Sequence, residues 1–167
     1  ARLIPQISGL MYAHTDNEIY CSFYTGSKVD FALTSGKVAL EQKTNYPFGE
    51  SIVLTVNPEK NDQTFSIKMR IPTWVGSQFV PGKLYSYVDN NSKAWELYIN
   101  DKKVGNLSFK KGEVSLDKGF VSISRKWKKG DKVELKLPMP VRYSHAINEV
   151  KADNDRVAIS RGPLVYC

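Results

Sequence analysis

The chain has 167 residues, and its 24 Lys and Arg against 17 Asp and Glu give a formal charge of +7. This length is typical of one domain that buries a core without disulfide staples. No run of eighteen apolar residues occurs, which excludes a membrane-spanning helix from the prediction. The two cysteines, Cys21 and Cys167, lie in apolar runs and are too few for a four-ligand zinc site.

The first thirteen residues differ in period from the rest. Their apolar side chains recur at helical spacing on one face. Pro5 is compatible with a first turn, where an N–H would be unpaired anyway. We therefore predict a short amphipathic helix from Ala1 to Ala13. Its apolar face comprises Leu3, Ile7, Leu10 and Met11.

From Glu18 onward the apolar period is two, the signature of strands with one buried face. With turns every 8–12 residues, about ten such strands predict an all-β antiparallel sandwich rather than βαβ units. Gly130 lies in a turn where a positive φ is expected. The main predicted strands are Ile19–Cys21, Phe31–Leu33, Val38–Leu40, Ile52–Val56, Phe65–Ile71, Leu97–Ile99, Val121–Trp127 and Val133–Leu137.

A long loop, from Thr73 to Ser92, is rich in aromatic residues. It contains Trp74, Phe79, Tyr85 and Tyr87. Loops of this length usually bind ligands or carry insertions, and exposed rings can stack on sugar faces. We therefore name Trp74 and Tyr85 as candidate substrate-binding residues. In contrast, Trp95 and Trp127 are in phase with strands and are predicted to be buried.

The positive charge is concentrated between Lys102 and Lys136, which contain eleven Lys and Arg against four Asp and Glu. Clustered cations can attract polyanions such as nucleic acid. The lysines, however, occupy the polar positions of alternating strands and carry no stacked-aromatic pattern. We favour the interpretation that they solvate exposed strands and protect sheet edges, and predict no nucleic-acid partner.

Residues with catalytic potential are few. A glycosidase needs two opposed carboxyl groups or a substitute nucleophile. The carboxylates Glu96, Glu113 and Glu134 fall at polar strand positions or in turns. A nucleophilic pair of Cys21 or Cys167 with His14 or His145 is disfavoured, because a buried apolar thiol is inert. We therefore predict no catalytic and no metal-ligating residue in this chain.

Several motifs occur together in one order. LPMPVR (137–142) and RVAISRGPLVYC (156–167) follow TNYPFGESIVLTVNPEK (44–60), FSIKMRIPTWV (65–75) and LYINDKKV (97–104). As a set they closely resemble the β-sandwich part of family 127 glycoside hydrolases, the bacterial β-L-arabinofuranosidase-like group. The resemblance covers nearly the whole chain.

The resemblance implies that residues 1–14 are the residual helix of a preceding helical (α/α) barrel and that residues 15–167 form the sandwich. It implies a parent enzyme that releases L-arabinofuranose from plant-type glycans with retention. In such enzymes a zinc-held cysteine is the nucleophile and a glutamate is the acid/base. The family's Cys-Cys-x-x-Asn motif has no match here and would lie before Ala1. Zinc is therefore expected in the missing catalytic domain, with no cofactor in this fragment, and a periplasmic or extracellular location is favoured.

Two functions follow for the chain itself. The first is a non-catalytic accessory domain whose partner is the helical catalytic domain. The alternative is a carbohydrate-binding sandwich that uses Trp74 and Tyr85. A third interpretation, nucleic-acid binding, rests on charge alone. No membrane partner is expected.

Overall fold

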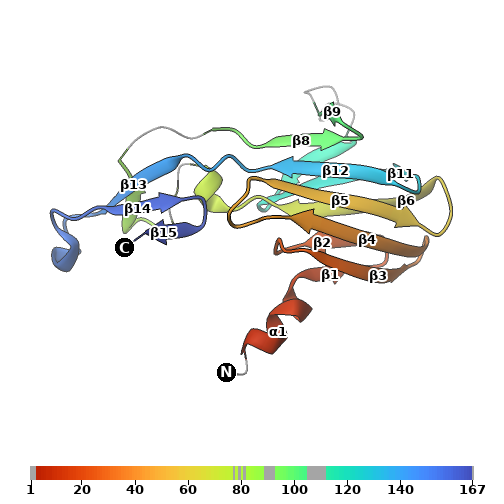
Figure 1. Ribbon diagram of the computed structural model, residues 1–167, viewed down its shortest axis with the longest axis horizontal. Coiled ribbons are helices and arrows are strands. Elements are labelled where there is room, and N and C mark those ends of the chain that lie inside the picture. Colours follow the sequence, from red (N-terminus) through yellow and green to blue (C-terminus); the bar gives the residue numbers. More distant parts are fainter. Residues whose placement is uncertain are drawn as a thin grey trace. The chain divides into compact units, whose positions relative to one another are not determined.

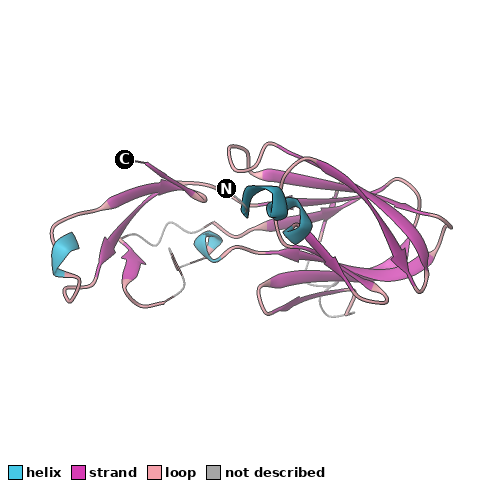
Figure 2. Ribbon diagram, turned by 90° about the horizontal axis from the view of Figure 1, so that it is seen from below, coloured by secondary structure: helices cyan, strands magenta, loops and turns pink. Residues whose placement is uncertain are grey.

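The computed structural model describes residues 3–76, 78, 80, 82–88, 93–104 and 112–166, with the side chains of residues 3–5 left out. The fold is mostly β with one short helix near its beginning, as predicted (Figures 1 and 2). That helix, α1 (Leu3–Leu10), is too short to cross a bilayer, and no described helix is long and apolar enough to do so. The predicted residues Phe79 and Cys167 and the side chain of Leu3 lie outside the described residues.

The chain divides into two compact units. Unit 1 comprises residues 1–70 and 96–135, and unit 2 comprises residues 71–95 and 136–167. The sequence predicts one sandwich over residues 15–167, and the contacts divide this stretch into two units, with boundaries after Arg70, Trp95 and Leu135. The first and last of these boundaries fall near Pro72 and Pro138, where prolines interrupt strand patterns.

Sheet A of unit 1 has five strands among the described residues. Its spatial order is β1 (Tyr12–His14), β2 (Glu18–Cys21), β6 (Gln63–Arg70), β11 (Phe120–Trp127) and β10 (Val114–Asp117). β2 pairs parallel with β6, whereas β6 with β11 and β1 with β2 are antiparallel. Strict alternation of buried and exposed residues along β6 fixes this register, because a slip of one residue would turn its apolar side chains to solvent.

In the part of unit 1 that the structure describes, sheet B has six strands. Their order is β3 (Ser27–Leu33), β4 (Gly36–Thr44), β5 (Ser51–Pro58), β12 (Asp131–Lys136), β8 (Glu96–Ile99) and β9 (Lys102–Lys103). The strands predicted at Phe31–Leu33 and Val38–Leu40 fall in β3 and β4, which pair as an antiparallel hairpin with Leu33 opposite Gly36 at the turn. Gly130 has φ +85°, as predicted, and donates to the Val56 carbonyl at 2.9 Å. Lys102, Lys126 and Lys132 are exposed, as expected for solvated strand positions.

The hydrophobic core of unit 1 lies between sheets A and B, which face each other in Figure 2. The ring of Tyr12 on β1 meets that of Phe31 on β3, with centroids 5.8 Å apart. Trp127 is fully buried, as predicted, whereas Trp95 in unit 2 is only half-buried, contrary to prediction. The strand at Leu97 begins at Glu96, so Trp95 precedes the paired residues and alternation does not place it.

Unit 2 is built around sheet C. Its order is β15 (Leu164–Tyr166), β14 (Ala158–Arg161), β13 (Val141–Ala146) and β7 (Tyr85–Tyr87), and two single-turn 3₁₀ helices, η1 (Thr73–Val75) and η2 (Lys151–Asp153), flank it. Among the described residues of this unit, the buried apolar ones are Leu137, Met139 and Val75. The loop predicted from Thr73 to Ser92 thus contains η1 and β7.

The N-terminal helix is shorter than predicted. α1 ends at Leu10, and Tyr12–His14 is instead strand β1, paired with β2. Pairing of Tyr12 with Cys21, and a 2.8 Å hydrogen bond between the hydroxyls of Tyr12 and Ser27, override the local helical pattern. Met11 is buried, while Ile7 and Leu10 are exposed.

Candidate functional site

Trp74, the first predicted binding residue, lies in η1 of unit 2. Its indole is half-buried, and its backbone carbonyl accepts a hydrogen bond from the Tyr87 hydroxyl at 3.4 Å. Pro138, Pro140 and Arg142 line the adjoining cavity. This cavity has a volume of only about 10 Å³, which is room for at most one water molecule and not for a sugar ring. Trp74 is therefore part of a packed cluster.

Arg142 holds this cluster together. Its side chain is 4% exposed, its guanidinium carbon lies 3.3 Å from the centroid of the Tyr87 ring, and Nη1 donates to the Gly76 carbonyl at 2.8 Å. A buried cation is stable only when partners such as this ring and this carbonyl compensate for its lost hydration. Arg142 thereby ties β13 to the backbone that follows η1. We call Trp74, Tyr87 and Arg142 the Arg142 cluster.

Tyr85, the second predicted binding residue, lies elsewhere on unit 2. It pairs with Ala146 across β7 and β13, and its hydroxyl donates to the carboxylate of Asp153 in η2 at 3.2 Å. The hydrogen bond to Asp153, together with its negative charge, raises the pKa of Tyr85. An open polar groove nearby is lined by Asp153, His145 and Arg156. The contacts thus join Trp74 to Tyr87 and Tyr85 to Asp153, so the two candidates do not form one platform.

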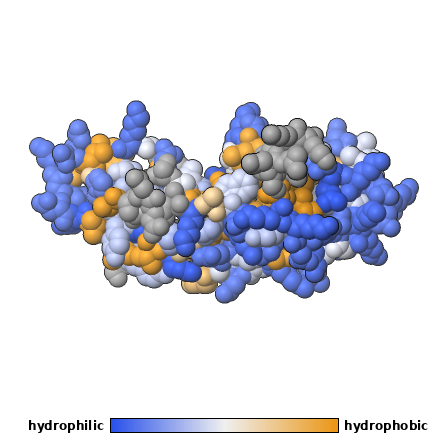
Figure 3. Space-filling view, turned by 90° about the horizontal axis from the view of Figure 1, so that it is seen from above, coloured by the Kyte–Doolittle hydropathy of each residue, from blue (hydrophilic) through white to orange (hydrophobic). Residues whose placement is uncertain are grey.

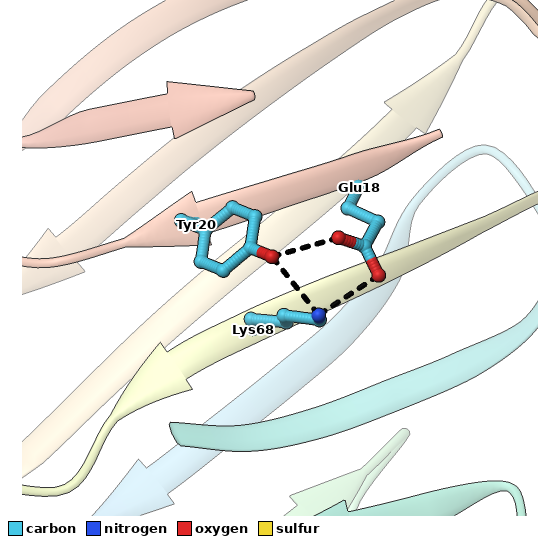
Figure 4. Close-up of polar contacts among 3 residues, drawn as sticks. All are labelled: Glu18, Tyr20 and Lys68. Atoms are coloured by element: carbon cyan, nitrogen blue, oxygen red, sulfur yellow. Dashed lines mark hydrogen bonds and ion pairs between the residues drawn. The ribbon is translucent and has the colours of Figure 1, made fainter. Parts of the chain in front are cut away.

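A second polar cluster lies on sheet A of unit 1 (Figure 4). The Tyr20 hydroxyl donates to Glu18 Oε2 at 2.7 Å, and Lys68 Nζ lies 2.8 Å from Glu18 Oε1 and 3.0 Å from the Tyr20 hydroxyl. Tyr20 and Lys68 are register partners of the parallel pair, with Glu18 two residues earlier on the same face. The Tyr20 ring also meets Phe120 edge-on at 5.6 Å. This Glu18–Tyr20–Lys68 triad links β2 to β6 through its side chains.

The triad stabilises the fold over a defined pH range. Hydrogen bonds from Lys68 and Tyr20 lower the pKa of Glu18 below 4.5, and the bond to Glu18 raises the pKa of Lys68 above 10.5. A lowered acid pKa stabilises the fold above pH 4.5, and this contribution is lost as pH falls through the folded value. A raised lysine pKa stabilises below pH 10.5, and this contribution is lost as pH rises. Both contributions are full between those two pH values.

Lys68→Met is therefore expected to lower the free energy of unfolding at pH 7 by less than about 1 kcal/mol, since the ion pair is partly solvated. Denaturant titrations at pH 7 and at pH 3 measure the difference from wild type. The difference should shrink toward pH 3, because a larger fraction of Glu18 is protonated as pH falls toward its folded-state pKa. An unchanged difference at the two pH values would instead assign the effect to the contact of the Lys68 ammonium with the Tyr20 ring, 4.8 Å from its centroid.

The thiol and imidazole candidates do not assemble into a nucleophilic site. Cys21 is a free, fully buried thiol, and burial raises its pKa to about 12. His14 contacts the Phe31 ring, and His145 Nε2 lies 3.4 Å from the Ser86 hydroxyl. Of the carboxylates, Glu134 accepts from Ser51 at 2.7 Å. Within the described ranges, no three His, Cys, Asp or Glu residues are grouped as metal ligands.

Sequence reasoning missed Arg142 and Tyr87 as the centre of the cluster. Arg142 lies within the recognised LPMPVR motif, and its placement between Val141 and Tyr143 was the available signal. In a strand with one apolar face, an arginine at an alternating position is expected to be exposed. Here the polar positions are the buried ones.

Two family models match the chain almost end to end. The model described as "Beta-L-arabinofuranosidase, GH127 middle domain" matches residues 18–139, and "Glycoside hydrolase family 127 C-terminal domain" matches residues 141–167. The chain belongs to glycoside hydrolase family 127. The boundary between the two family 127 models, at residue 140, lies at the prolines that follow β12.

Individual family 127 proteins are also similar to this chain. The chain is 29% identical over its whole length to a non-reducing end β-L-arabinofuranosidase of Bifidobacterium longum, of which it covers 22%. A solved GH127 β-arabinofuranosidase is 39% identical, with a TM-score of 0.88 over 99% of this chain and 25% of that one. A GH127 β-L-arabinofuranosidase from Geobacillus stearothermophilus T6 is 32% identical, with a TM-score of 0.80 over 99% and 22% of the two chains. The chain thus spans about a quarter of the length of these relatives.

Proposed function

We propose that this chain is the non-catalytic β-sandwich part of a bacterial β-L-arabinofuranosidase that acts on plant-type glycans. The observation that carries the proposal is the pair of family models, which match a middle and a C-terminal domain in a chain about a quarter as long as its relatives. In this proposal the chemistry resides in a helical catalytic domain. A zinc ion and its ligands would belong to that domain.

The contacts within unit 1 favour a structural role over a catalytic one. Its candidate reactive groups are already used in the fold, since Cys21 is in the core and Glu134 is bonded to Ser51. At the start of the chain α1 leaves Ile7 and Leu10 exposed beside the buried Met11. An exposed apolar stripe on a short helix needs a partner, because eight residues are too few to be stable alone. The catalytic domain is the proposed partner of this stripe.

The test compares the 167-residue chain with the same protein at the length of its relatives. With an aryl β-L-arabinofuranoside and added zinc, the long protein is expected to turn over, and the short chain is expected to give no turnover above buffer. Turnover by the short chain, retained after extensive purification, would falsify the assignment of chemistry to the other domain. In the long protein, Leu10→Asp is expected to lower the unfolding midpoint more than Phe23→Asp, which is similarly exposed but outside α1.

The carbohydrate-binding alternative stays a prediction. Saturable binding of an arabinofuranosyl oligosaccharide, measured by calorimetry on the long protein made catalytically inert, would support it if Trp74→Ala abolished the binding. Trp95→Ala is the matched control, because that indole is also half-buried in unit 2. Loss of binding in both variants would indicate damage to the fold of unit 2 rather than a sugar contact.

A further inference from the structure

In the middle of sheet C of unit 2, neighbouring residues of β13 and β14 have their polar side chains buried and their apolar side chains exposed. On β13, Arg142 and Ser144 are 4% and 2% exposed, whereas Val141 and Tyr143 are 52% and 46% exposed. Ser160 on β14 is buried too, while its neighbour Ile159 is 38% exposed. The face that carries Arg142 and Ser144 is covered within unit 2 along β13. The opposite face, which carries Val141 and Tyr143, is left to solvent.

The exposed apolar side chains are in register across three strands. Tyr143 pairs with Ile159, and Ile159 pairs with Tyr166. The next row along the strands joins Val141, Arg161 and Leu164 in the same way. Directly opposed residues project from the same side of a sheet, with strands about 4.8 Å apart. We call Val141, Tyr143, Ile159, Leu164 and Tyr166 the Tyr143 face.

A contiguous face of this kind differs from scattered exposed apolar residues, which are normal on any surface. Figure 3 shows hydrophobic atoms reaching the surface among hydrophilic ones in the part of the chain that contains sheet C, at the left of the view. A sheet that is apolar on one face is stable only when that face is covered by another layer. Large exposed patches therefore mark interaction sites.

We infer that the Tyr143 face is the inner surface of a two-layer sandwich, covered by a second β-sheet from the part of the C-terminal domain that the relatives have in addition to these residues. The C-terminal family model begins at Val141, the first residue of β13, and matches 27 residues, 141–167. Among the described residues, unit 2 buries only Val75, Leu137 and Met139 as apolar side chains, which is a small core for a separate compact unit. The relatives are about four times longer than the chain and have room for the second layer.

The composition of the face favours a protein layer over a glycan. Val, Ile, Leu and Tyr in register are the side chains that interdigitate between packed sheets about 10 Å apart. A sugar site combines an aromatic surface with several convergent hydrogen-bonding groups. Among the described residues, the register places Ser86, His145 and Arg161 on this side of the sheet, and the Ser86 hydroxyl already lies 3.4 Å from the His145 ring.

The experiment uses the protein at the length of its relatives and compares lysine substitutions at two neighbouring residues of β15. Tyr166, on the Tyr143 face, is 51% exposed, and Val165, on the opposite face, is 55% exposed. If a second layer covers the Tyr143 face, Tyr166→Lys and Tyr143→Lys each lower the unfolding midpoint by at least about 5 °C, as a buried charge does. Val165→Lys shifts it by less than about 1 °C.

A second measurement does not depend on folding of the variants. Hydroxyl-radical labelling of the wild-type long protein is expected to modify Tyr143 and Tyr166 at least tenfold more slowly than Phe48, which is 66% exposed in unit 1. Equal labelling, or equal midpoints for the three lysine variants, overturns the inference. Loss of glycan binding in Tyr143→Lys with an unchanged midpoint overturns it in favour of a sugar platform. Conversion of a dimer into a stable monomer overturns it in favour of a second copy. All of these outcomes are independent of whether the chain alone hydrolyses a glycoside.

Discussion

Replacing Trp127 by alanine is expected to lower the free energy of unfolding of unit 1 by about 3–5 kcal/mol, the range for a large aromatic removed from a core. Trp127 is fully buried between sheets A and B, and its ring stacks on Phe65 with centroids 5.7 Å apart. Its Nε1 donates to the Phe65 carbonyl at 2.9 Å. Removal leaves a large cavity and a buried carbonyl that loses this donor. Denaturant titration followed by circular dichroism measures the loss.

Two control variants separate the contributions. Trp127→Phe keeps most of the ring and removes the Nε1–H donor, so a smaller loss of about 1–3 kcal/mol is expected. Trp95→Ala removes an indole that is only half-buried and should cost clearly less than Trp127→Ala. A loss below about 1 kcal/mol for Trp127→Ala would contradict the placement of this ring at the centre of the core.

Gly162→Ala is expected to destabilise unit 2 by about 2–4 kcal/mol. Gly162 has φ +58° in the turn between β14 and β15, which costs an L-residue about 1 kcal/mol. An added Cβ would also lie 2.8 Å from Cγ and Sδ of Met139, whose side chain is buried. Overpacking of this kind adds about 1–3 kcal/mol. Hydrogen exchange at the β13 and β14 amides reports the loss within unit 2.

The matched control is Gly112→Ala. Gly112 also has a positive φ, +72°, but no described atom lies within 4 Å of its added Cβ, so only the backbone strain of about 1 kcal/mol is expected. The double variant Gly162→Ala with Met139→Ala should cost less than the sum of the two single variants, because the shortened side chain makes room for the methyl group. Strict additivity would show that the predicted clash does not occur.

Much of unit 1 could be predicted from its sequence, because its strands are long and alternate strictly. Phe65, Ile67 and Met69 are buried on β6, and Val121, Ile123 and Trp127 are buried on β11, as their period-2 spacing predicts. Short strands such as β7 lack enough residues to show a period. Their positions depend on partners distant in the sequence, such as Ala146 for Tyr85.

The candidate site shows the limit of pattern reasoning. Alternation tells which residues share a face, but it does not tell which face is covered. On β13 the usual assumption that apolar residues are inside would have buried Tyr143 and exposed Arg142, and the structure has the reverse. Trp74 and Tyr85 are close in sequence, yet contacts with Tyr87 and Asp153 hold them in different places. The sequence could identify the aromatic residues but not their three-dimensional partners.

The position of β6 also affects how this protein reaches its fold during synthesis. Lys68 pairs with Tyr20 on one side and with Ser122 on the other, so the centre of sheet A joins three segments that are far apart in the chain. Such non-local pairing makes folding slow, because the chain loses entropy in closing long loops before the contacts between the strands can stabilise it. Until the ribosome has released Phe120–Trp127, one edge of β6 has no strand to pair with. During that interval the nascent chain presents an open, apolar strand to its neighbours, and it is then most exposed to aggregation and most dependent on chaperones.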